Sequence, residues 1–241
     1  MTLISLKTAS RLLDCTGFMN WHYGVTFNTI LTINFEQLGM TSDAEIAKIR
    51  NKLNTALQQQ IINGGRKYGD EQQHHYIYAM ECSRDHGLHM HKVLAVPGYF
   101  AIRIKDWLQK WARRNFGEDV NPKAVHVRCN CVQNFTDRIF IQSKLVRYIL
   151  KTTEDVTLLD QHGYPKSVKH MIGLKRGCTS QSFSTNRIAG SSQSISYGEQ
   201  IRWCYQPVKQ WEDVLNGWKL DDYRSRVSAQ KFCKSIEGIE I

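Results

Sequence analysis

The stretch HHYIYAMECSRDHGLHMHKVLAV, residues 74–96, holds two strand-like runs on either side of a short polar segment. Residues 74–81 and 87–96 are rich in aromatic, β-branched and other apolar side chains, as strands are. Residues 82–86 between them are suited to a turn. The sequence therefore predicts an antiparallel β-hairpin. We expect the remaining elements to be arranged around it.

Two histidines lie in the second strand of this hairpin. Because side chains alternate along a strand, His89 and His91 point to one face, while Leu88, Met90 and Leu94 point to the other. Two neighbouring imidazoles can chelate one divalent ion, which usually requires a further carboxylate or water. The pattern by itself fits equally well two histidines that face solvent.

A carboxylate stands close to this pair in the sequence. Glu81 ends the first strand, and its side chain lies near His89 if the hairpin register allows it. Glu81 could also be a solvated residue at a strand end. Asp85 and His86 in the turn are alternative ligands, although residues at a turn tip are more often simply solvated.

The other elements follow from their hydrophobic periods. We expect further strands at 25–35 and 124–133, and helices at 44–62, 99–117 and 136–153. Thr41–Asp43 offers an N-cap for the first helix, and Asn63–Gly65 marks its end. This order predicts an α+β fold in which helices cover one face of a central antiparallel sheet and leave the other open to a ligand.

We expect a core domain at residues 1–155 and a C-terminal extension at 156–241 that packs on it. Residues 173–196 are basic and rich in Gly, Ser and Thr, which predicts a loop. Two helical stretches follow near 206–217 and 221–236.

The charge balance favours a polyanionic partner. Lys and Arg total 32 against 22 Asp and Glu, a formal net charge of +10. No basic amphipathic helix with a Trp/Leu face and no long apolar segment stands out, so nucleic acid is favoured over a membrane. The 7 cysteines form no C-x-x-C pair, which argues against a disulfide framework or a zinc finger. We expect a soluble, cytoplasmic or otherwise intracellular protein.

The segment KLVRYILKTTED, residues 144–155, contains a tyrosine flanked by cations. Tyr148 and Lys151 are three positions apart on the predicted helix and share a face, with Lys144 one turn earlier. Such a tyrosine is either an amphipathic residue at the edge of the core or a nucleophile next to a phosphate.

Three motifs in order, FNTILTI (27–33), LHMH (88–91) and YILK (148–151), resemble those of the HUH endonuclease superfamily. The resemblance is closest to rolling-circle replication initiators with one catalytic tyrosine. It implies an HUH or RRM-like palm in which Glu81, His89 and His91 hold Mg²⁺ or Mn²⁺. Tyr148 would be the nucleophile, and Lys151 would steady the tyrosinate or the phosphate.

The resemblance implies a site-specific single-stranded DNA endonuclease and strand transferase. Its products would be a 5′-phosphotyrosine and a free 3′-OH, and its substrate single-stranded or hairpin origin DNA. No G-x-x-x-x-G-K-[ST] motif occurs, so we expect a separate helicase. Basic side chains are candidates for gripping the DNA backbone: Arg103, Lys105, Arg113, Arg114, Lys144, Arg147, Lys175 and Arg176.

Three other readings stay open. A transposase would use the same chemistry on different DNA. A non-catalytic nucleic-acid-binding sheet of the RNA-recognition type would stack bases on Tyr76 and Tyr78. A zinc hydrolase would use the two histidines and Glu81 and leave Tyr148 idle.

Overall fold

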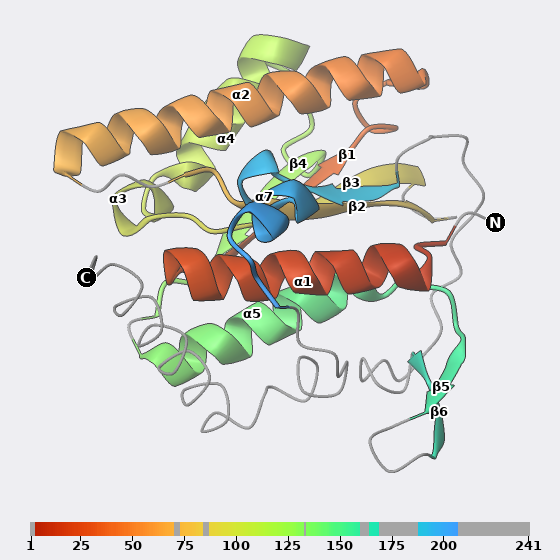
Figure 1. The fold of residues 1–241 in the computed structure, drawn as a ribbon. Coiled ribbons are helices and arrows are strands. Elements are labelled where there is room, and N and C mark those ends of the chain that lie inside the picture. Colours follow the sequence, from red (N-terminus) through yellow and green to blue (C-terminus); the bar gives the residue numbers. More distant parts are fainter. Residues whose placement is uncertain are drawn as a thin grey trace.

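The centre of the protein is an antiparallel sheet of five strands (Figure 1). The computed structural model describes residues 3–69, 73–83, 87–132, 134–159, 164–168 and 188–206. The strands are β1 (Thr29–Asn34), β2 (Tyr76–Ser83), β3 (Gly87–Leu94), β4 (Val125–Cys129) and β7 (Ala189–Ser191). Their order is β4-β1-β3-β2-β7, and every neighbouring pair is antiparallel. The predicted α+β class and the hairpin at its centre are confirmed.

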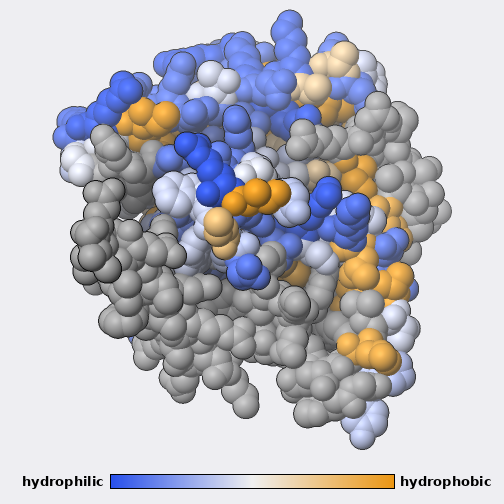
Figure 2. All heavy atoms as spheres, viewed as in Figure 1, coloured by the Kyte–Doolittle hydropathy of each residue, from blue (hydrophilic) through white to orange (hydrophobic). Residues whose placement is uncertain are grey.

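Helices lie on both faces of this sheet (Figure 1). One layer consists of α1 (Leu6–Tyr23) and α5 (Phe135–Leu150), and the other of α2 (Asp43–Tyr68), α3 (Gly98–Ala101) and α4 (Ile104–Phe116). The expectation of one open face was therefore wrong. The outward side of α2 is largely hydrophilic (Figure 2).

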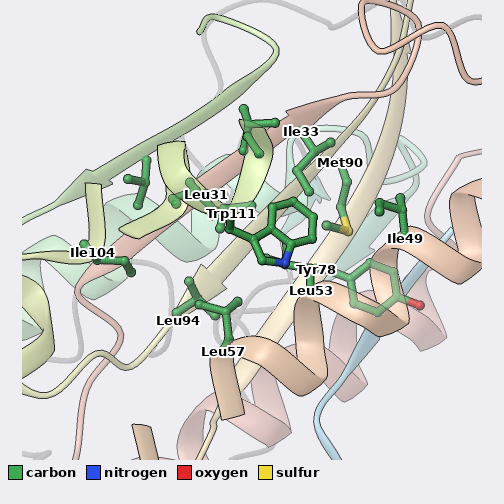
Figure 3. Packing of buried hydrophobic residues seen from close by; sticks show 14 of the residues in the cluster. Leu31, Ile33, Ile49, Leu53, Leu57, Tyr78, Met90, Leu94, Ile104 and Trp111 are labelled. Carbon is green, nitrogen blue, oxygen red and sulfur yellow. The ribbon is translucent and has the colours of Figure 1, made fainter. Parts of the chain in front are cut away.

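The alternation along the strands explains the two layers. Leu31 and Ile33 of β1 pack with Met90 of β3 against α2 and α4, in the cluster that Figure 3 shows. Ile77 of β2 and Val93 of β3 belong to a second cluster with α1 and α5. Because both faces of the sheet carry apolar side chains, both must be covered.

The helix α1 is absent from the predicted order of elements. Ser5 caps it by accepting a hydrogen bond from the Thr8 backbone N–H, and Gly24 ends it in the left-handed conformation. Its buried side chains include Phe18 and Met19, which have no exposed surface and belong to the cluster between α1, α5 and the sheet. The apolar pattern of residues 6–23 could have predicted this helix.

The helix α2 begins at the predicted cap, where Ser42 accepts a hydrogen bond from the Glu45 backbone N–H. It does not end at Asn63–Gly65 as predicted but continues to Tyr68. A Cβ atom on Gly64 would lie 2.2 Å from the ring of Tyr99. The glycine therefore allows close packing of that ring and does not stop the helix.

The remaining differences concern shorter segments. The predicted helix 99–117 is divided into α3 and α4, with Arg103 at the start of α4. β5 (Thr157–Leu159) and β6 (Pro165–Ser167) form a separate two-stranded sheet. Residues 189–195, predicted as loop, contain β7 and the 3-10 helix η1 (Gln193–Ile195), and α7 (Tyr197–Arg202) follows.

The C-terminal segment contributes directly to the core. Strand β7 pairs with β2, so a part of the predicted extension 156–241 completes the sheet. The helices expected near 206–217 and 221–236 lie outside the described residues, apart from Gln206. Among the helices that the structure describes, none has the length and apolar character needed to cross a membrane.

Candidate active site

The register of the β2–β3 hairpin brings a carboxylate and two imidazoles to one place. Glu81 lies directly across from His89, and His91 lies across from Ala79 on β2 and Thr32 on β1. Glu81, His89 and His91 all point toward the α5 side of the sheet, because Met90 between the histidines packs in the α2 and α4 layer. The predicted facing of the two histidines is confirmed.

The three side chains converge on a single point. Oε2 of Glu81 lies 3.3 Å from Nε2 of His89 and 3.2 Å from Nε2 of His91. The potential ligand atoms lie within 4.8 Å of one another, and all three residues are buried. This Glu–His–His cluster could hold a metal ion.

Neighbouring groups orient both imidazoles. Nδ1 of His89 lies 2.9 Å from the Gly87 carbonyl, and Nδ1 of His91 lies 2.9 Å from Oγ1 of Thr32. A carbonyl oxygen can only accept, so His89 donates through Nδ1, and its neutral form carries a lone pair on Nε2. Metal-binding histidines are commonly held in this way by the ring nitrogen that does not bind the metal.

This tautomer of His89 favours a proton or a metal cation at the centre of the cluster. With Nδ1 of His89 protonated, the lone pair on Nε2 faces an oxygen of the Glu81 carboxylate. Two lone pairs at this distance repel unless a proton or a cation lies between them. The donor set therefore fits a divalent cation. Since Mg²⁺ usually takes oxygen ligands, a first-row ion such as Mn²⁺ is the better match of the two expected ions.

Lys151 and Tyr148 complete the site from α5 and the turn that follows it. Nζ of Lys151 lies 2.6 Å from Oε2 of Glu81 and 4.1 Å from the centre of the Tyr148 ring. The Tyr148 hydroxyl lies 3.4 Å from Nε2 of His91, and this tyrosine is 41% exposed. Its hydroxyl thus borders both the buried cluster and the surface.

Helix α5 is held over the sheet by polar and apolar contacts. Asn20 of α1 and Gln142 of α5 exchange two hydrogen bonds through their buried amides, and the Phe27 backbone N–H donates to the same Gln142 oxygen. Leu145 and Ile149 of α5 are buried in the same layer. These contacts fix the helix that carries Tyr148.

The cluster perturbs the acidity of its own members. Burial alone would raise the pKa of Glu81, but the contacts with His89 and His91, together with the hydrogen bond and charge of Lys151, lower it well below its ordinary value. Burial likewise favours the neutral form of Lys151, yet the Glu81 carboxylate raises the pKa of this ammonium group. Burial lowers the pKa of His91, and Lys151 lowers it further against the opposing effect of Glu81. Glu81 is therefore an anion and Lys151 a cation.

The predicted DNA-binding residues do not form one surface. Lys144 and Arg147 lie on α5 beside Tyr148. Arg103, Lys105, Arg113 and Arg114 lie on or at the start of α4, in the layer on the other face of the sheet. Lys175 and Arg176, and the alternative ligands Asp85 and His86, fall outside the described residues.

The two aromatic residues expected in a base-stacking sheet already contact basic side chains, and Tyr78 is also buried. Tyr78 is buried beneath α2, where Arg50 lies over its ring and donates to its hydroxyl. The Tyr76 ring carries Nζ of Lys92 at 3.4 Å from its centre. An open aromatic face of the RNA-recognition type is therefore not available at these two residues.

Two positioning residues are not among the predicted site residues. Thr32 lies within the motif FNTILTI, but its contact with His91 depends on the β1–β3 register. Gly87 has a φ of +60°, and a Cβ atom there would lie 1.4 Å from Oε2 of Glu36. The glycine at the start of β3 was a usable signal for a tight turn.

Comparison with known proteins gives no family assignment. No protein-family model matches this chain, and no curated protein or solved structure matches it. The chain is thus characterised by its own features: an α+β fold in which a tyrosine hydroxyl adjoins a buried Glu–His–His cluster.

Proposed function

We propose that this protein is a DNA nicking and joining endonuclease of the single-tyrosine HUH type, which initiates rolling-circle replication on single-stranded or hairpin DNA. The observation that carries the proposal is the 3.4 Å approach of the Tyr148 hydroxyl to Nε2 of His91. A nucleophile and a cation-binding cluster adjoin each other there, as phosphodiester transesterification requires.

In the proposed reaction, the Tyr148 oxygen attacks the scissile phosphorus and loses its proton to water. The bond from phosphorus to the 3′ oxygen breaks, and the leaving oxygen takes a proton from water, giving a 5′-phosphotyrosine and a free 3′-OH. A divalent ion held by Glu81, His89 and His91 would neutralise charge on the phosphate oxygens. The reverse attack by a 3′-OH rejoins the strand without an external energy source, because the covalent bond is conserved.

Lys151 has a supporting role in this reaction. Its ammonium group lies 4.1 Å from the centre of the Tyr148 ring, and its bond to Glu81 keeps it in place and charged. A cation at this position stabilises the negative charge that develops on the tyrosine oxygen. Lys144 on the same helix is exposed and available to the DNA backbone, whereas Arg147 is half-buried.

The proposal is tested by looking for the covalent intermediate. The full-length protein is incubated with Mn²⁺ and a pool of labelled single-stranded oligonucleotides of randomised internal sequence, and then run on a denaturing gel. We expect a labelled band at the size of the protein plus a DNA fragment, absent when EDTA is added. A labelled pool that stays at its free position with Mn²⁺ present would count against the nuclease.

Metal content separates this function from a zinc hydrolase. The same two histidines and one glutamate could bind zinc tightly, and Tyr148 would then have no role. A nicking enzyme of the proposed kind should regain adduct formation when Mn²⁺ is added to the metal-free protein.

A further inference from the structure

A cavity of about 690 Å³ lies at the β7 edge of the sheet, away from the Glu–His–His cluster. Helix α2, the start of β2 and the segment from β7 to α7 form its walls. Its lining includes Asn54, Gln58, His74, Tyr76, Ser194 and Arg202. This volume is within the range of pockets that bind small molecules or cofactors.

His74 gives this pocket an unused hydrogen-bonding atom. The residue is only 7% exposed, and its Nε2 is buried without a hydrogen-bond partner among the residues that the structure describes. Buried polar atoms are nearly always paired, so an unpaired one on a residue that lines a pocket points to a ligand atom that pairs with it. The neighbouring His75 differs, because its Nδ1 lies 2.9 Å from Oγ of Ser194.

The pocket is polar but close to neutral. Arg202 forms an ion pair with Glu199 at 3.7 Å, and both line the cavity. Burial, with Lys92 and His75 nearby, lowers the pKa of His74 well below its ordinary value, so its imidazole is uncharged. The other polar groups are amides and hydroxyls, which donate and accept hydrogen bonds. Such walls suit a neutral ligand that itself both donates and accepts hydrogen bonds.

We infer that this pocket binds a nucleobase, with His74 as the buried hydrogen-bonding partner. Base edges present adjacent donors and acceptors that amides match, and the rings of Tyr76 and His74, whose centroids lie 4.8 Å apart at 43°, form an aromatic part of the wall. The inference rests on the proposed function in one respect: if the protein acts on single-stranded DNA, that strand is the most direct source of the base. A free nucleoside carries the same chemistry.

The pocket and the cluster share strand β2. Tyr76 begins the strand, and Glu81 lies five positions later on the opposite face. At about 3.3 Å per residue, the two sites are about 17 Å apart along the strand. A base bound near His74 would therefore belong to a nucleotide at some distance from the scissile phosphate.

The first experiment is a titration of the full-length protein with adenosine, guanosine, cytidine and thymidine. The imidazole resonances of His74 are followed by NMR and assigned with a His74→Phe variant. We expect at least one nucleoside to shift them with a dissociation constant below about 1 mM. No shift with any of the four at their solubility limits overturns the inference.

Substitutions locate the binding. His74→Phe keeps the ring and removes the nitrogen, so affinity should fall about tenfold or more. Gln58→Trp fills the pocket from the exposed side of α2 and should weaken binding similarly, even if the His74 variant does not fold. Gln59→Trp is the matched control, because Gln59 is also exposed on α2 but does not line the cavity. Wild-type affinity in Gln58→Trp would contradict the assignment.

Two further arms separate the possible outcomes. Homopolymeric single strands that bind more tightly than the matching nucleoside, and lose this advantage in Gln58→Trp, identify the strand as the source of the base. Nucleoside binding without strand binding identifies a free nucleoside. If the covalent adduct forms but no nucleoside binds, the base-binding pocket is excluded and the proposed nuclease stands. If a nucleoside binds but no adduct forms, the nuclease is excluded and the pocket stands.

Discussion

The hydroxyl of Tyr148 lies 3.4 Å from Nε2 of His91, although the two residues are 57 positions apart in the sequence. One belongs to α5 and the other to the centre of the sheet, and their rings meet edge to face at 4.7 Å between centroids. The packing of α5 on β3 therefore creates a site that neither element contains alone.

Tyr148→Phe should abolish the covalent DNA adduct. The ring keeps its contact with His91, so the fold and DNA binding should stay within a few-fold of the wild type, whereas the nucleophilic oxygen is lost. Adduct is measured on a denaturing gel and binding by fluorescence anisotropy. Tyr197→Phe, at another exposed tyrosine, is the control and should retain the adduct. Adduct that persists in Tyr148→Phe would exclude this tyrosine as the nucleophile.

Glu81→Gln should weaken Mn²⁺ binding by about a hundredfold or more, because a charged ligand becomes a neutral amide. Isothermal titration calorimetry of the metal-free protein measures this directly. Glu36→Gln is the matched control, since Glu36 is an exposed carboxylate near Gly87 that is not part of the cluster. Equal affinities in the wild type and Glu81→Gln would remove the cluster as the metal site.

Lys151→Met should have opposite effects on metal binding and on catalysis. The ammonium group lies 2.6 Å from the Glu81 oxygen and repels any cation bound there. Removing one charge a few ångströms from a divalent ion should tighten Mn²⁺ binding by about 1 kcal/mol, or about fivefold. The rate of adduct formation should fall, and Lys151→Arg should restore part of it. Weaker Mn²⁺ binding in Lys151→Met would show that the lysine supports the metal site.

Gly87→Ala should destabilise both the hairpin and the orientation of His89. The φ of Gly87 is +60°, and the new Cβ would displace Glu36. Gly69→Ala measures the backbone strain alone, about 1 kcal/mol, because φ there is +66° and nothing lies within 4 Å of the new atom. We expect a larger loss of unfolding free energy in Gly87→Ala, and weaker Mn²⁺ binding, since the Gly87 carbonyl accepts from His89. Identical losses in the two variants would exclude a special role for Gly87.

The stability of the protein should depend on His75 between pH 6.5 and 4. Burial, with His22 nearby, lowers the pKa of this imidazole from 6.5 to about 4. Between these pH values the unfolded chain binds a proton on His75 that the folded chain does not bind. The contribution of His75 to the free energy of unfolding is therefore full above pH 6.5 and is lost as the pH falls toward 4. The loss amounts to about 1.4 kcal/mol per pH unit within this window.

Urea unfolding at a series of pH values, with EDTA present, tests this dependence. His75→Gln should make the decline in unfolding free energy below pH 6.5 less steep, while His74 and His91, whose pKa values are also lowered, keep the remainder. The exposed His126 provides the control, and His126→Gln should leave the decline unchanged. A wild-type slope in His75→Gln would show that other groups carry the effect.

Local patterns in the sequence determined the hairpin, the facing of its histidines and most of the helices. The alternation in GLHMHKVL placed His89 and His91 opposite Met90, because side chains of a strand alternate whatever surrounds it. The cap at Ser42 and the helical spacing of residues 46–61 likewise depend only on neighbours along the chain. Glu81 could be named from its place at the end of the first strand, and Tyr148 and Lys151 from the resemblance of the three motifs, but the distances between these residues could not be predicted.

The tertiary structure decided how these elements meet. The pairing of Glu81 with His89 depends on the hairpin register, and a shift by one residue would have turned the carboxylate to the other face. The second helical layer, the fifth strand β7 and the approach of Tyr148 to His91 depend on contacts between segments far apart in the chain. The sequence determines such contacts only through the packing of the whole core, and so only the folded chain places the tyrosine beside the Glu–His–His cluster.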